Sequence, residues 1–112
     1  MKIMIVDDEK DIGLILGGEF QGQGHETVSL TSVREAIRYL EERPVDVVIC
    51  EFEMPELNGM TLFSWLRLNR PHVPFYILTG VPLVDNEKIL ELGVKDILFK
   101  PQDLVRITQL FM

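Results

Sequence analysis

Three carboxylates, a hydroxyl and an ammonium stand where short apolar runs of this sequence end. Asp7 and Asp8 follow the first such run, and Glu51 follows a later one. Thr79 and Lys100 end two further runs. Carboxylate oxygens suit a hard octahedral cation such as Mg²⁺, whereas a lysine and a hydroxyl suit the oxygens of a phosphoryl group. Brought together, these residues predict a site for metal-assisted handling of a phosphoryl group or of a mimic of one.

These residues can meet if the apolar runs are strands of one parallel sheet. The chain alternates such runs with segments whose apolar residues recur at helical spacing, for example Ile12, Leu16 and Phe20. This alternation predicts an α/β fold, in which ligands bind outside the carboxyl ends of the strands. We expect strands at 2–6, 25–30, 45–50, 75–79 and 96–99, and helices at 11–21, 32–42, 60–68, 84–92 and from 101 onward.

Local signals support several of these elements. Ser32 followed by Glu35 is a capping-box pattern at a helix start, and Gly93 is a left-handed cap at a helix end. The almost continuous apolarity of 45–50 predicts a strand buried on both faces. Glycines at 13, 17 and 18 weaken the first helix, because each costs up to ~1 kcal/mol relative to alanine.

The composition narrows the class of protein. A length of 112 residues predicts one domain. The net charge of −7 argues against a nucleic-acid surface, which needs clustered Lys and Arg. No apolar stretch approaches the ~20 residues of a membrane span, so we expect a cytoplasmic protein that does not contact the membrane. The single cysteine, Cys50, is expected to be a small buried hydrophobe.

Four segments carry a resemblance to a known family: IVDDE at 5–9, DVVICEFEMPELNG at 46–59, ILTG at 77–80 and GVKDILFKP at 93–101. In order, spacing and strand context they resemble the receiver domain of response regulators, and the resemblance covers essentially the whole chain. It implies a flavodoxin-like fold, with a five-stranded parallel sheet in the order 2-1-3-4-5 sandwiched by five helices. We expect one receiver domain over residues 1–112, with its final helix cut short.

The resemblance also implies roles for individual residues. Thr79 would contact a phosphoryl group and Lys100 would pair with it, and a partner histidine kinase would donate that group to the acid at position 51. The ligands of Mg²⁺ would be Asp7, Asp8, the acid at position 51 and the backbone carbonyl of Glu53. Lys100-Pro101 resembles the family's junction between a lysine and a cis-proline.

Two positions depart from the family's pattern. The family has aspartate at the phosphoryl-accepting position, whereas this chain has Glu51. The family commonly has Tyr or Phe at the switch position that accompanies Thr79, whereas this chain has Ile97. Both departures bear on whether the domain works as a phosphorylation switch.

Glutamate at position 51 should impair phosphorylation. Its side chain reaches about 1.3 Å further than that of aspartate, and phosphoryl transfer depends on a nucleophile in line with the breaking bond. Our hypothesis is that Glu51 accepts a phosphoryl group poorly or not at all and that the domain signals without one. The alternatives are slow phosphorylation of Glu51, an inactive site on a docking scaffold, and a direct contact of Glu51 with Lys100 that closes the pocket without metal.

The resemblance further implies a surface for partners. In the family, helix four, strand five and helix five carry output and dimer contacts, so we expect an output face with Val94, Ile97, Val105 and Met112. Its partners would be a histidine kinase or another signalling protein, or a second copy of the chain. We expect no enzyme: a phosphatase of the dehalogenase-like type would need a second acid two residues after a nucleophilic aspartate on the first strand, in apolar surroundings that position 9 lacks.

Overall fold

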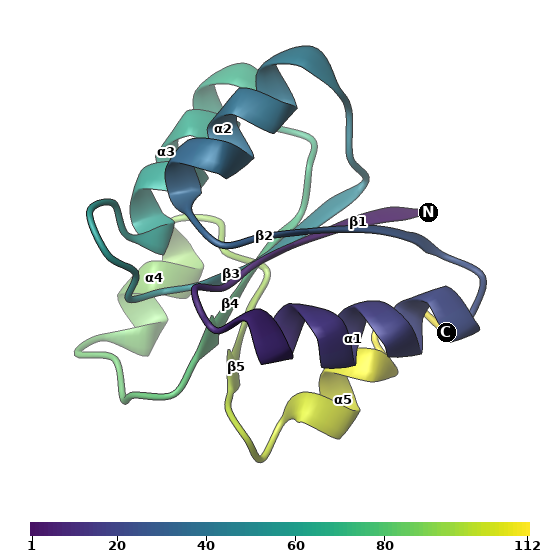
Figure 1. Cartoon of the computed structure of the whole chain (residues 1–112). Coiled ribbons are helices and arrows are strands. Elements are labelled where there is room, and N and C mark those ends of the chain that lie inside the picture. Colours follow the sequence, from purple (N-terminus) through teal and green to yellow (C-terminus); the bar gives the residue numbers. More distant parts are fainter.

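A computed structural model describes all residues, 1–112, as a three-layer α/β fold. Its five parallel strands pair in the order β2-β1-β3-β4-β5, as predicted. Figure 1 shows α1 and α5 on one face of the sheet and α2, α3 and α4 on the other. The elements in chain order are β1 (Lys2–Val6), α1 (Lys10–Gly22), β2 (Glu26–Leu30), α2 (Val33–Glu42), β3 (Val47–Glu51), α3 (Gly59–Asn69), β4 (Phe75–Thr79), α4 (Asn86–Glu91), β5 (Asp96–Phe99) and α5 (Leu104–Thr108).

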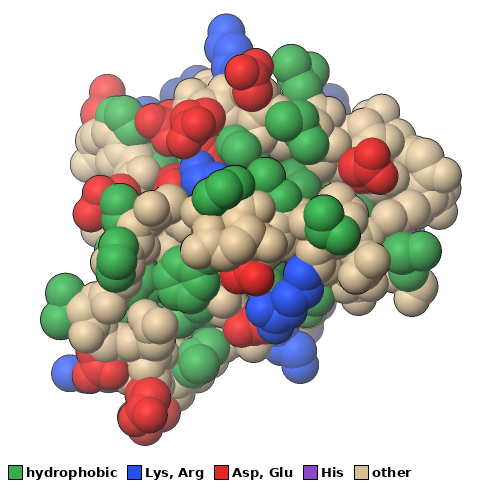
Figure 2. All heavy atoms as spheres, turned by 90° about the horizontal axis from the view of Figure 1, so that it is seen from below, with side chains coloured by type: hydrophobic (Ala, Val, Ile, Leu, Met, Phe, Trp, Pro, Cys, Tyr) green, Lys and Arg blue, Asp and Glu red, His purple; other side chains and the backbone are tan.

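The surface carries apolar as well as charged side chains. Figure 2 views the side of the molecule that carries α5, and hydrophobic side chains stand there among acidic and basic ones. Val105 on α5 and Met112 at the chain end are both exposed. None of the helices has the length and apolar character that crossing a bilayer requires.

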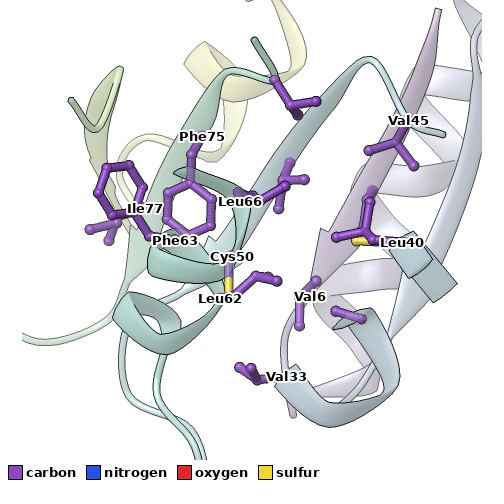
Figure 3. Close-up of a cluster of buried hydrophobic side chains, with 14 of the residues drawn as sticks. Val6, Val33, Leu40, Val45, Cys50, Leu62, Phe63, Leu66, Phe75 and Ile77 are labelled. Carbon is purple, nitrogen blue, oxygen red and sulfur yellow. The ribbon is translucent and has the colours of Figure 1, made fainter. Parts of the chain in front are cut away.

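Two hydrophobic clusters hold the layers together, one on each face of the sheet. The first lies under α2, α3 and α4 and includes Cys50, Leu62, Phe75 and Ile77 (Figure 3). The second lies under α1 and α5 and includes Phe20 and Ile107 on the helices, with β-strand side chains beneath them. All five positions of β3 are buried, which confirms the prediction of a strand covered on both faces.

The sequence signals at several element ends are confirmed. The Ser32 hydroxyl accepts a hydrogen bond from the Glu35 backbone N–H at 3.1 Å, at the start of α2. Gly93, with φ of 115°, follows α4 in the left-handed region. The predicted limits of β4 and β5 match the structure. The last helix begins at Leu104 rather than at 101, because residues 100–103 form turns in which Asp103 accepts from the Phe99 N–H at 2.7 Å.

One of the glycines that weaken α1, Gly13, has a packing role. A Cβ at Gly13 would lie 3.0 Å from the Cβ of Ser29 on β2, whereas a Cβ at Gly17 would lie 3.5 Å from the Thr27 hydroxyl, an ordinary contact distance. Gly13 therefore lets α1 approach β2 closely, and this packing offsets its low helix propensity. Because β1 leads directly into α1, the position of α1 also fixes the loop that carries Asp7 and Glu9.

Candidate functional site

The carboxyl ends of four strands deliver their polar side chains to one edge of the sheet. Asp7 follows β1, Glu51 ends β3, Thr79 ends β4 and Lys100 follows β5. Parallel pairing keeps these ends in register, since β3 lies between β1 and β4. The structure therefore brings together four of the residues that the sequence analysis selected.

Lys100 is the centre of this site. Its ammonium lies 2.9 Å from Asp7 Oδ2 and 3.0 Å from Glu51 Oε1. It also lies 3.0 Å from Glu9 Oε1. The side chains of Lys100, Asp7 and Glu51 are at most 9% exposed, whereas that of Glu9 is 66% exposed. The alternative in which Glu51 reaches Lys100 directly is therefore the arrangement observed.

The remaining oxygens of the two buried carboxylates accept backbone hydrogen bonds. Asp7 Oδ1 accepts from the Glu9 N–H at 2.9 Å. Glu51 Oε2 accepts from the Phe52 N–H at 2.6 Å and from the Glu53 N–H at 3.4 Å. The Glu51 side chain thus folds back over the start of the β3–α3 loop. Every oxygen of both carboxylates has a donor from within the chain.

Burial and neighbouring charges shift several pKa values at the site. Burial raises the pKa of Asp7, against the lowering effects of the Glu9 N–H and of Lys100. Burial alone would lower the pKa of Lys100, but hydrogen bonds to Asp7, Glu51 and Glu9 raise it above its usual value. Burial, and then the charges of Glu51 and Asp7, raise the pKa of the Cys50 thiol. Lys100 is therefore a permanent cation, and Cys50 is an inert thiol.

Thr79 is at the site but is not bonded to it. Its side chain is fully buried. Its hydroxyl accepts from the Val81 N–H and donates to the Val81 carbonyl, both at 3.2 Å. The hydroxyl is thereby engaged with the loop after β4 rather than with Glu51 or Lys100.

The predicted Mg²⁺ ligands do not fit the ion in this arrangement. No group of three or more His, Cys, Asp or Glu side chains is disposed to hold a metal ion. Asp8 is exposed and stands outside the Lys100 cluster. The carboxylates of Asp7 and Glu51 instead both contact the ammonium of Lys100. The peptide bond between Lys100 and Pro101 is cis, as the resemblance implied.

Sequence reasoning missed two residues that shape the site. Glu9, two positions after Asp7, is the third carboxylate on Lys100, and its place beside the first strand end was the only available signal. Gly59 lies against the backbone of β3, where a Cβ would be 2.6 Å from the Glu51 carbonyl oxygen. Its N–H also donates to the Phe52 carbonyl at 2.8 Å. In the sequence, Gly59 is only the last residue of the segment 46–59 that resembles the family, and nothing there reveals this close approach.

The expected output face needs a correction. Val94 and Ile97 are only 4% and 6% exposed, because both pack into the hydrophobic cluster under α2, α3 and α4. Their side chains are therefore not available to a partner at the surface. Val105 and Met112 are 69% and 85% exposed, so these two residues remain available at that face.

Comparisons with known proteins agree with the fold. The family described as "Response regulator receiver domain" matches residues 3–111. Regulator of RpoS from Escherichia coli is 32% identical over 97% of this chain, and Response regulator protein PilR from Pseudomonas aeruginosa is 31% identical over 97%. The chain spans 33% and 25% of their respective lengths.

The fold is likewise that of solved receiver proteins. A response regulator receiver protein from Pseudomonas putida superimposes with a TM-score of 0.89 at 25% identity, over 98% of this chain and 93% of that one. The response regulator TrrA from Thermotoga maritima, in complex with Mg²⁺-BeF, gives a TM-score of 0.84 at 22% identity, over 96% and 93% of the two chains.

Proposed function

Because this chain belongs to the response regulator receiver domain family of two-component signalling, we propose that it is an atypical receiver that acts through protein–protein contacts without being phosphorylated. The observation that carries the proposal is the state of the Glu51 carboxylate. One oxygen is held by Lys100 at 3.0 Å and the other by the Phe52 N–H at 2.6 Å. Neither oxygen is free to line up with a phosphoryl donor.

Alignment matters because positioning supplies most of the catalysis in phosphoryl transfer. To attack a donor, Glu51 would have to give up its contact with Lys100 or its backbone hydrogen bonds. Glu51 as a whole is also only 7% exposed, which limits the approach of a phosphoryl donor to its carboxylate. Glu51 should therefore be a poor acceptor, although position 51 lies where the family places its acceptor.

Phosphorylation would then not change the charge at position 51. Glu51 carries one negative charge, compared with about −1.5 to −2 on a phosphoryl group. Because the Thr79 hydroxyl is engaged with Val81, this charge does not draw Thr79 toward the site. The site around Glu51 would therefore stay in one state, and the signal would come from changes in the partners that the domain binds.

The partners we propose are a histidine kinase or another signalling protein, and a second copy of the chain. The exposed residues Val105 and Met112 offer apolar contact on and after α5. The domain would provide contacts and no catalytic turnover, so a generic phosphate ester should not be hydrolysed in the presence of Mg²⁺. The Thermotoga protein binds Mg²⁺ together with BeF, but signalling without phosphotransfer gives this chain no need for the ion.

The test is intact mass spectrometry after incubation with acetyl phosphate and Mg²⁺. We expect the natural protein to gain no phosphoryl group and the Glu51→Asp variant to gain one. Glu53→Asp, which shortens a neighbouring exposed carboxylate, is the matched control and should stay unmodified. A phosphoryl group on the natural protein, mapped to Glu51, would instead make the chain a working phospho-receiver with glutamate as acceptor.

A further inference from the structure

We propose that the ammonium of Lys100 takes the place of a divalent cation in this site, so that the domain is built to work without Mg²⁺ and binds it only weakly. The inference goes beyond the proposed function, because it concerns cation binding in the absence of any phosphoryl donor. It rests on the contacts of Lys100 and on the reach of Glu51.

The first argument is the position of the ammonium. It lies within 3.0 Å of oxygens from Asp7, Glu9 and Glu51, three carboxylates that come from two different strand ends. Mg²⁺ binds oxygens at 2.0–2.1 Å in octahedral geometry. A Mg²⁺ ion that bridged Asp7 and Glu51 would therefore lie close to the ammonium of Lys100, which contacts the same carboxylates. The two positive charges would repel each other.

The second argument is the use of the carboxylate lone pairs. Besides Lys100, Asp7 accepts from the Glu9 N–H, and Glu51 accepts from the N–H groups of Phe52 and Glu53. A metal ion would have to compete with these donors as well as with Lys100. A carboxylate that already has its hydrogen-bond donors gains less from coordination than one that is bare.

The third argument is the length of the side chain at position 51. Glutamate carries its carboxylate about 1.3 Å further than aspartate, and this reach brings Oε1 to 3.0 Å from Lys100. Aspartate at the same position would withdraw the carboxylate and loosen that contact. Glu51 thus brings its carboxylate to the lysine. The three carboxylates and the ammonium leave a net charge of −2, and the exposed Glu9 carries one of these charges, where water screens it.

The test is a titration with Mg²⁺ alone, without a phosphoryl donor. Binding is measured by calorimetry and by the NMR shifts of the Phe52 and Glu53 amides, which donate to Glu51. We expect Lys100→Met to bind Mg²⁺ on the order of tenfold to a hundredfold more tightly than the natural protein. Lys95→Met removes the same charge from an exposed lysine outside the cluster and should leave the affinity unchanged.

A second variant keeps the test decisive if Lys100→Met does not fold. Glu51→Asp retains every charge of the site and only withdraws one carboxylate, so it should also bind Mg²⁺ more tightly than the natural protein. Equal affinity in the natural protein and in the folded variants would overturn the proposal. Because no phosphoryl donor is present, this result would be distinct from a failure of Glu51 to accept a phosphoryl group.

Discussion

The negative charge of the buried Asp7 lowers the stability of the folded protein. It is 2% exposed, and its burial raises its pKa above the ordinary value of 3.8. A raised pKa means that folding favours the protonated form, so the negative charge of Asp7 costs stability at neutral pH. Lys100 reduces this cost without removing it. Buried charges of this kind are typical of sites kept for function rather than for stability.

The Asp7→Asn variant should therefore be more stable than the natural protein at pH 7, by about 0.5–2 kcal/mol. The gain comes from removing a buried charge, while Lys100 keeps Glu9 and Glu51 as partners. Below pH 3.8 the aspartate is protonated in the unfolded and folded chains alike, so the difference should vanish there. It should grow as the pH rises through the raised pKa. Urea unfolding at several pH values measures it, and a less stable variant at pH 7 would contradict the expectation.

At the scale of the residue, the sequence predicted where side chains converge, and one of its alternatives was the observed contact of Glu51 with Lys100, but it did not predict the other contacts. Asp7, Glu51 and Lys100 could be placed at one edge because parallel strands end together. The partners of Thr79 and the part played by Glu9 depend on rotamers and on loop paths. No spacing in the sequence specifies these.

At the scale of the element, α1 is the clearest case in which packing outweighs propensity. Gly13 and Gly18 are equally poor helix formers, yet their surroundings differ. A Cβ at Gly13 would meet Ser29 at 3.0 Å, whereas nothing lies within 4 Å of a Cβ at Gly18. The two glycines therefore give a matched pair of substitutions within one helix.

Gly18→Ala should stabilise the protein by about 0.5–1 kcal/mol, because alanine lowers the entropy cost of the helix and meets no neighbour. Gly13→Ala should destabilise it by roughly 1–3 kcal/mol, because α1 must move away from β2. Thermal and urea unfolding of the two variants would measure the difference. Equal effects would show that the approach of α1 to β2 is looser than the distance to Ser29 indicates.

Every helix and strand was predicted from apolar runs, helical periodicity and start or stop residues, but several of the limits were wrong. The predicted helix over 84–92 begins at Asn86 instead, since Asp85 caps it by accepting from the Lys88 N–H at 3.1 Å. Val84 lies outside that helix and is fully exposed. A capping aspartate after an apolar residue is a stronger start signal than the apolar residue itself.

At the scale of the whole molecule, the question is which face meets a partner. Burial removed Val94 and Ile97 from the predicted output face and left Val105 and Met112. The sequence could not show this, because Ile97 on β5 and Val94 just before it are apolar residues whose burial depends on how the neighbouring helices pack. The partner surface is consequently smaller than predicted, and of the predicted residues only those on and after α5 remain exposed.

If the chain pairs with itself through α5, Val105→Glu should weaken the pairing by about tenfold or more. The new carboxylate would enter an apolar contact between chains that already carry a net charge of −7 each. Leu68→Glu makes the same change at an 85% exposed position on α3 and serves as the control. Analytical ultracentrifugation measures both variants. A natural protein that stays monomeric, or identical pairing in the two variants, would count against this face.

The buried thiol of Cys50 is a natural reporter on the opening of the central strand, β3. Its thiol lies in β3 at 0% exposure and donates to the Glu51 carbonyl at 3.2 Å. Only a thiolate is alkylated readily, and the pKa of this thiol is raised, so a reagent can act only when the central strand opens to water. With one cysteine in the chain, the rate of alkylation counts those openings without any engineered label. A partner that slows the alkylation of Cys50 must therefore make β3 open less often, even though it binds at the surface of the domain.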